Sequence, residues 1–235
     1  MTERLDEITN GLARMGISCG PGEAAALLVH LRLVDEANAS FNLTAIAPGD
    51  SVAMHVLDSA AAVPFLDAAP EGDFADLGSG AGFPGIPLAI LTGRSVTLVE
   101  SVKKKAAFLE RAAAELRLKA TVQPVRAEEL ATERRGGYSA VTARALSSLP
   151  SLVELASPLL CVGGVLICLK GRPEDAELAR GDAAAALCGM VRTETSAVIV
   201  PGIDAARTVV VFRRSGKSKL VLPRRNGMAQ RQPIV

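Results

Sequence analysis

The chain has 235 residues, 49% of them hydrophobic, and its 26 basic and 25 acidic side chains leave a formal net charge of +1. A chain of this length can bury a full hydrophobic core, and its hydrophobicity together with nearly balanced charge excludes global disorder. Six phenylalanines, one tyrosine and no tryptophan argue against a nucleic-acid surface built from rows of stacking aromatic rings.

The charge is distributed unevenly along the chain. Residues 1–206 carry 18 basic and 25 acidic side chains, a balance of −7, whereas residues 207–235 carry eight basic side chains and no acidic one. A basic C-terminal arm on an acidic body indicates an arm that binds phosphates. A solvated tail that keeps the protein soluble explains the same composition, so both interpretations stay open here.

The hydrophobic pattern predicts helices first and an alternating α/β region afterwards. Amphipathic helices are expected over residues 3–15, 22–38 and 50–64. From residue 73 onwards, short β-branched runs alternate with helical patterns, which is typical of a parallel sheet with crossover helices. The expected strands span 73–77, 95–100, 120–125, 138–143, 163–169, 191–200 and 207–213. The expected helices between them span 84–91, 102–117, 126–132, 148–158 and 173–187.

The last two expected strands are joined only by Pro201 to Asp204. This link is too short for a parallel crossover, so the two strands should form an antiparallel hairpin. The sequence therefore predicts an α/β fold with a Rossmann-like, seven-stranded sheet whose last strand is antiparallel. We expect a helical extension packed on the core at 1–70, the sheet domain at 71–214 and the basic arm at 215–235.

Compartment and metal content follow from the N-terminus and the cysteines. The N-terminus lacks the apolar core of a signal peptide, and the longest apolar run, 159–169, is too short to span a bilayer. The four cysteines are scattered, and the chain has only two histidines. We therefore expect a cytoplasmic protein with buried thiols, without a zinc site and without a membrane partner.

A glycine-rich loop follows the first expected strand, in the run D-L-G-S-G-A-G-F-P-G at 76–85. Glycines at the carboxyl end of a first strand allow a tight turn and a close approach of a ligand to the main chain. Gly80, Gly82 and Gly85 satisfy G-x-G-x-x-G, the dinucleotide pattern, while Gly78, Gly80 and Gly82 satisfy a G-x-G-x-G loop preceded by an acid. The glycines alone do not separate the two patterns.

The acidic residues around the loop favour one ligand over the other. A dinucleotide places its pyrophosphate at the helix N-terminus, where negative charge is favourable. S-adenosylmethionine, with a sulfonium and an amino-acid tail, instead favours a carboxylate near the loop, and Asp76 supplies one. Glu100 ends the second strand, where a carboxylate can hold ribose hydroxyls in either ligand. Asp76 and the terminal hairpin therefore favour the sheet of an S-adenosylmethionine-dependent methyltransferase.

Ordered motifs extend this interpretation to a family. They are N-L-T-A-I at 42–46, H-V-L-D-S at 55–59, D-L-G-S-G-A-G-F-P-G-I-P-L-A-I at 76–90, V-E-S-V-K-K-K at 99–105, F-L-E at 108–110, A-E-E at 127–129, A-R-A at 143–145, L-K-G at 169–171 and P-R-R-N-G-M-A-Q-R-Q-P-I at 223–234. In this order they resemble the bacterial glucose-inhibited division protein B family, also called ribosomal RNA small subunit methyltransferase G. That family methylates N7 of a guanine in 16S ribosomal RNA.

The resemblance implies site residues in addition to those argued from the loop. Cofactor contacts transfer to Gly78, Phe83, Ala127, Glu128 and Arg144, each in a matching motif. Asp76, Gly80 and Glu100 join them on the physical argument. Members often carry Asp where this chain has Glu100, whose longer side chain should still reach the ribose.

Catalytic residues are expected at the ends of strands and on the third helix. Arg144 and Lys170 end the fourth and fifth strands, where they open onto the ligand crevice; Arg144 would hold the cofactor or the base, and Lys170 a phosphate. His55 and Asp58 lie one turn apart on one helix face. Alone they indicate a surface pair that fixes the helix, but the resemblance implies an active-site wall with Asn42 and Thr44.

The expected reaction requires no general base, because N7 of guanine carries an in-plane lone pair and no proton. Alignment of the reacting atoms can then carry catalysis. The expected partner is 16S ribosomal RNA or the small ribosomal subunit, bound by a monomer with help from the basic arm. Truncation after Arg214 should weaken RNA binding and leave cofactor affinity intact.

Two other functions fit parts of the sequence. A nicotinamide-dependent oxidoreductase would use the same type of sheet and the same ribose contact. A non-catalytic RNA-binding module would retain a cofactor loop without using it. The intact loop from Asp76 to Gly82, with Glu100, argues against the second alternative.

Overall fold

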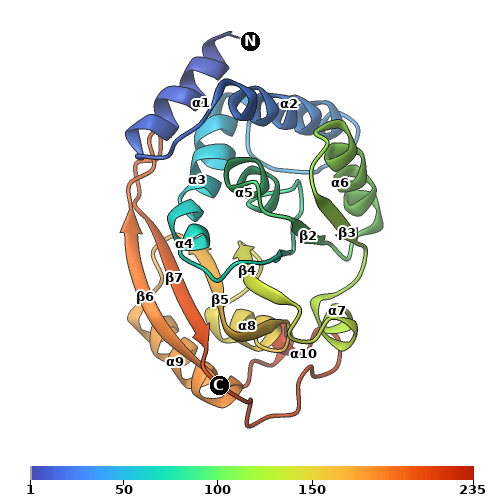
Figure 1. The fold of residues 1–235 in the computed structure, drawn as a ribbon, viewed down its shortest axis with the longest axis vertical. Helices are drawn as coiled ribbons and strands as arrows, with labels where there is room; N and C mark the ends of the chain where they lie inside the picture. The colour runs from blue at the N-terminus through green and yellow to red at the C-terminus, as the bar shows by residue number, and fades with distance from the viewer. Residues whose placement is uncertain (1) are drawn as a thin grey trace.

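The computed structural model describes residues 2–235 and contains one seven-stranded sheet with helices on both faces (Figure 1). The strands are β1 Phe74–Leu77, β2 Val96–Val99, β3 Ala120–Gln123, β4 Tyr138–Arg144, β5 Leu160–Lys170, β6 Met190–Val198 and β7 Arg207–Arg214. Their order across the sheet is β3-β2-β1-β4-β5-β7-β6. Strands β1 to β5 pair in parallel, and β7 pairs antiparallel with both β5 and β6. The predicted seven-stranded sheet with an antiparallel last strand is confirmed.

The helices cover the two faces of the sheet in separate layers. They are α1 Thr2–Arg14, α2 Pro21–Asn38, η1 Pro48–Asp50, η2 Val52–Leu57, α3 Asp58–Ala60, α4 Val63–Asp67, α5 Gly85–Thr92, α6 Lys103–Glu115, α7 Ala127–Glu133, α8 Leu149–Ala156, α9 Asp175–Cys188 and α10 Met228–Arg231. No helix within residues 2–235 combines the length and the apolar character needed to cross a membrane.

Side chains that alternate in direction along the strands form one hydrophobic core on each face of the sheet. Because neighbouring strand residues point to opposite sides, Phe74 packs with α1 to α6 while Ala75 packs with α7 to α9. Val209 and Val210 divide in the same way on β7. The N-terminal helices therefore share a continuous core with one face of the sheet.

The predicted single helix over 50–64 is replaced by shorter pieces of different winding. A 3₁₀ turn, η1, leads into the π-helical η2, which passes into α3 and then α4. A π-helical turn widens the helix locally and is frequent at functional sites. Here it carries His55, with Asp58 directly after it.

The basic C-terminal segment, residues 215–235, lies against the sheet domain instead of extending into solvent (Figure 1). Arg224 donates from Nε and Nη2 to the two carboxylate oxygens of Glu154 on α8, both at 2.6 Å. Leu222 and Ala229 are buried in the core on the α7 to α9 face. Composition alone could not exclude a solvated tail, because it does not show whether a guanidinium group has an acidic partner in the fold.

Candidate cofactor and substrate site

Two adjoining cavities lie at the edge of the sheet where the parallel strands end. The larger, about 540 Å³, is lined by the loop before η1, by η2, by the loop after β1 and by the ends of β4 and β5. The smaller, about 250 Å³, lies over the ends of β1 and β2 and the start of α7. Gly78, Gly80 and Ala145 line both cavities. This edge is where open α/β sheets bind ligands.

The glycine loop between β1 and α5 depends on the absence of side chains at two positions. Gly78 has φ of +69°, and a Cβ there would lie 2.7 Å from Cδ1 of Leu146. A Cβ on Gly85 would lie 2.6 Å from Cδ2 of Leu98 and 2.8 Å from Oδ2 of Asp76. The loop backbone can therefore line both cavities and approach a ligand closely.

Asp76 is a fully buried carboxylate beneath this loop. Its Oδ1 accepts a hydrogen bond from Oγ1 of Thr142 at 2.7 Å, whereas Oδ2 has no partner among residues 2–235. Burial raises the pKa of Asp76 to about 6, against the opposing effects of Thr142, Ser79, the Gly85 backbone and the charge of Arg144. Asp76 lines neither cavity, so its charge lies beneath the loop that a ligand in the cavities would contact.

Two further carboxylates line the smaller cavity. Glu100, 7% exposed, accepts from the backbone N–H of Gly80 at 3.0 Å and of Val102 at 2.8 Å. Glu128, at the start of α7, accepts from the backbone N–H of Gly227 at 2.6 Å. Together with Ala127 they place the predicted cofactor residues of β2 and α7 beside Gly78 and Gly80.

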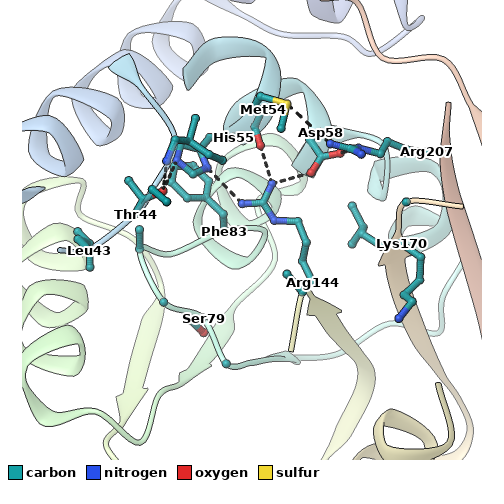
Figure 2. Close-up of a pocket in the computed structure, with 18 residues that line it drawn as sticks. Leu43, Thr44, Met54, His55, Asp58, Ser79, Phe83, Arg144, Lys170 and Arg207 are labelled. Atoms are coloured by element: carbon teal, nitrogen blue, oxygen red, sulfur yellow. Dashed lines mark hydrogen bonds and ion pairs between the residues drawn. The ribbon is translucent and has the colours of Figure 1, made fainter. Parts of the chain in front are cut away.

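Asp58 binds two arginines from different strands on one wall of the larger cavity (Figure 2). Arg144, at the end of β4, donates from Nη1 to Oδ2 of Asp58 at 2.7 Å and to the Met54 carbonyl oxygen at 2.8 Å. Arg207, at the start of β7, donates from Nε to Oδ1 at 2.7 Å. The side chain of Asp58 is only 8% exposed, so the carboxylate holds both guanidinium groups where solvent screens them little.

The same arginine sets the protonation of His55. Nη2 of Arg144 lies 3.2 Å from Nδ1 of His55, and because arginine only donates, Nδ1 is the acceptor. Nε2 then carries the proton and donates to Oγ1 of Thr44 at 3.2 Å. Burial lowers the pKa of His55 to about 3, with contributions from Arg144 and His30. His55 is therefore neutral, and neither ring nitrogen has a free lone pair.

The ring of Phe83 stacks against two imidazoles beneath the larger cavity. Its centroid is 4.1 Å from that of His55, with an interplanar angle of 3°, and 4.4 Å from that of His30. His30 bonds the Ala81 carbonyl oxygen through Nε2 at 2.9 Å, and burial lowers the pKa of His30 to about 4. Phe83 is only 4% exposed, so its ring packs against these imidazoles and offers little surface for a base to stack on.

Lys170 also borders the larger cavity, but its amine points away from the Asp58 cluster (Figure 2). Its Nζ lies 2.8 Å from Oε1 of Glu177 and donates to the Ser147 carbonyl oxygen at 3.2 Å. Thr44 lines the cavity as the sequence predicted, whereas Asn42 is exposed and lies outside the lining.

The structure adds residues that sequence reasoning missed at the site. Arg207 was counted with the basic arm, yet it lines the larger cavity. An antiparallel strand begins at the edge where parallel strands end, so the predicted hairpin contained the signal that places Arg207 beside Lys170. Gln230 of α10, also counted with the arm, lines the smaller cavity.

The described part of the chain, residues 2–235, holds no group of three His, Cys, Asp or Glu side chains suited to a metal ion. The charged and polar groups that line the two cavities include carboxylates, arginines, two lysines, a glutamine and the glycine-loop backbone. This set suits an organic ligand with cationic, hydroxyl and heterocyclic groups.

The strand order, the antiparallel β7 and the glycine loop after β1 define the fold of S-adenosylmethionine-dependent methyltransferases. A solved structure with this fold is the 1,6-didemethyltoxoflavin-N1-methyltransferase of Burkholderia thailandensis (TM-score 0.54, 15% identity, 85% of this chain and 92% of that chain). Another is the geranyl diphosphate C-methyltransferase of Streptomyces coelicolor A3(2) (TM-score 0.51, 18% identity, 66% and 79%).

The chain belongs to the rRNA small subunit methyltransferase G family, GidB, whose family model matches residues 23–202. Ribosomal RNA small subunit methyltransferase G of Deinococcus radiodurans is 38% identical over 97% of this chain and 91% of its own length. The enzyme of that name from Stenotrophomonas maltophilia K279a is 41% identical over 86% of this chain and 92% of its own length. The resemblance drawn from the sequence motifs is confirmed.

Proposed function

We propose that the protein transfers a methyl group from S-adenosylmethionine to N7 of a guanine in 16S ribosomal RNA. The observation that carries this proposal is the pairing of Asp76 and Glu100 with one glycine loop, in a chain of this family. The negative charge of Asp76 beneath the loop suits the cationic methionine part, and Glu100 in the smaller cavity suits the ribose. The glycine positions of the loop suit a ligand that lies against the main chain.

The cofactor residues divide between the two cavities. Gly78 and Gly80 adjoin both cavities, and Phe83 and Arg144 border the larger one. Ala127 and Glu128 offer a backbone amide and a carboxylate beside Glu100 for the adenine. When bound, S-adenosylmethionine supplies the methyl group on a sulfonium that leaves as a neutral sulfide.

The chain's own residues then bind and orient, without removing a proton. N7 of guanine has a lone pair and no proton, so no base is needed, and His55 has no free lone pair to act as one. Asp58 fixes Arg144 and Arg207 at the cavity wall. Two arginines against one carboxylate give this wall a positive balance that suits an RNA phosphate, whereas Lys170 is paired with Glu177.

The same proposal covers partners and compartment. We place the enzyme in the cytoplasm as a monomer that needs no metal, with 16S ribosomal RNA or the small subunit as its partner. Exposed basic residues of the C-terminal segment, such as Lys217 and Arg225, would contact phosphates. Sedimentation should give the mass of one chain, and a chelator should leave methyl transfer unchanged.

Transfer of labelled methyl to ribosomal particles tests the function. Small subunits from a strain lacking the gene should accept label from S-adenosylmethionine, and cleavage chemistry specific for N7-methylguanine should map it to one base. If the particles stay unlabelled, the protein would instead be a non-catalytic RNA-binding module. Titration with S-adenosylhomocysteine and with NAD tests the other alternative, a nicotinamide-dependent oxidoreductase, because such an enzyme would bind NAD more tightly.

Thr44→Val should lower methyl transfer while leaving cofactor affinity intact. The substitution removes the oxygen that accepts from Nε2 of His55 and from the backbone N–H of Ile46. Loss of these bonds should cost about tenfold in kcat. Kinetics on small subunits should place the loss in kcat, and Thr44→Ser, which keeps the hydroxyl, should restore most of it. Equal rates for Thr44→Val and the wild type would remove Thr44 from the mechanism.

A further inference from the structure

The C-terminal segment contributes a wall of the smaller cavity that the proposed function does not yet use. Gln230 of α10 lines this cavity together with Glu100 and Glu128. Its Nε2 donates to the Leu146 carbonyl oxygen at 3.5 Å, and its amide oxygen has no partner within residues 2–235. The segment therefore presents a neutral acceptor to a space that already contains two carboxylates.

This wall is fixed to the body at several points. Glu154, 3% exposed, accepts two hydrogen bonds from Arg224, both at 2.6 Å, and Arg224 also donates to the Gln232 carbonyl oxygen at 2.8 Å. The backbone N–H of Gly227 donates to Oε1 of Glu128, and the Asn226 amide donates to Glu129. Ala229 is 1% exposed. Residues 224–229, directly before the cavity-lining glutamine, are therefore held in place.

Glu128 connects this wall to the ligand. One of its carboxylate oxygens is occupied by Gly227, and the other has no partner among the described residues. Lys105 and Arg126 also line this cavity, but the free oxygens of Glu128 and Gln230 favour a ligand group that donates hydrogen bonds. The exocyclic amine of adenine is such a donor, and the ribose hydroxyls can reach Glu100 in the same cavity.

We infer that residues 227–230 form part of the cofactor site and that Gln230 contacts the adenine ring. The inference rests on the proposed function, because S-adenosylmethionine supplies that ring. It reverses the expectation that truncation after Arg214 leaves cofactor affinity intact, since truncation removes Gln230, Gly227 and the Arg224 partner of Glu154. The basic segment is then a cofactor wall as well as a candidate RNA contact.

The test uses the full chain with Gln230→Ala and, as a matched control, Gln232→Ala. Both glutamines are exposed and lie two positions apart, but only Gln230 lines the cavity. Calorimetric titration measures two ligands, S-adenosylhomocysteine and methylthioadenosine, which share the adenosine and differ in the amino-acid tail. Gln230→Ala should weaken both ligands by about three- to tenfold, the loss of one hydrogen bond, with an unchanged melting temperature.

The possible outcomes separate this inference from the proposed function. Equal affinities for Gln230→Ala and the wild type would overturn the inference while the function stands. Weakening of S-adenosylhomocysteine alone would place Gln230 at the amino-acid tail and also overturn it, as would an equal loss in Gln232→Ala. A wild type that binds neither ligand would overturn the proposed function itself.

Discussion

Asp58→Asn is expected to reduce methyl transfer at least about a hundredfold and to destabilise the fold by about 3 kcal/mol. Asp58 accepts from Arg144 and Arg207 through its two oxygens, both at 2.7 Å, with a side chain only 8% exposed. Asparagine keeps one acceptor and places an amide donor against the other guanidinium. One partly buried positive charge then loses its partner, and Arg144 loses the position that orients His55.

Chemical denaturation and single-turnover methyl transfer measure the two effects separately. Asp35→Asn is the matched control, because Asp35 pairs with Arg4 at 2.8 Å but is 32% exposed, so its loss should cost less than about 1 kcal/mol. Adding Arg207→Met to Asp58→Asn removes the unpaired guanidinium and should recover part of the stability. If Asp58→Asn keeps the stability and the methyl-transfer rate of the wild type, then Asp58 does not position Arg144 and Arg207 for the reaction.

Asp76→Asn should have opposite effects on stability and on binding. Burial raises the pKa of Asp76 to about 6, above its ordinary value of 3.8. The folded state therefore resists ionisation, and stability is lost as pH rises from the unfolded pKa through the folded one. At neutral pH this costs up to about 3 kcal/mol. Asparagine carries no charge, so the variant should be more stable than the wild type by up to that amount.

The gain in stability should depend on pH in a specific way. Denaturant unfolding at pH 7.5 should show the full difference between Asp76→Asn and the wild type, and at pH 4.5 the difference should shrink to about 1 kcal/mol. Asp73→Asn, at an exposed position just before β1, should match the wild type at both values within about 0.5 kcal/mol. A constant gain at both pH values would contradict a raised pKa in the folded protein.

Ligand binding by the same variant should be impaired. The ionised Asp76 is the form that suits the cationic part of the cofactor, so wild-type affinity for S-adenosylhomocysteine should rise about tenfold from pH 5 to pH 7. Asp76→Asn should bind about ten- to a hundredfold more weakly, because it lacks the negative charge beneath the loop, and its affinity should not show that pH dependence. Unchanged affinity in Asp76→Asn would place the ligand's cation elsewhere.

Much of the fold could be predicted because local patterns specify it. The β-branched runs and crossover helices of the sheet domain end within a few residues of their predicted positions, and the short Pro201–Asp204 link correctly predicted the antiparallel hairpin. The third helix was harder to predict, because a π-helical turn such as η2 has nearly the same hydrophobic pattern as an α-helix.

The sequence by itself determined the layout of the fold, the glycine loop between Asp76 and Gly85 and the family. Only the tertiary structure decided which charges meet. Asp58 joins Arg144 and Arg207 across 86 and 149 positions, and Glu154 joins Arg224 across 70. A basic stretch has the same composition whether its guanidinium groups are solvated or paired with acids. The difference lies in the acid that the folded sheet brings within hydrogen-bond distance, which no local pattern records.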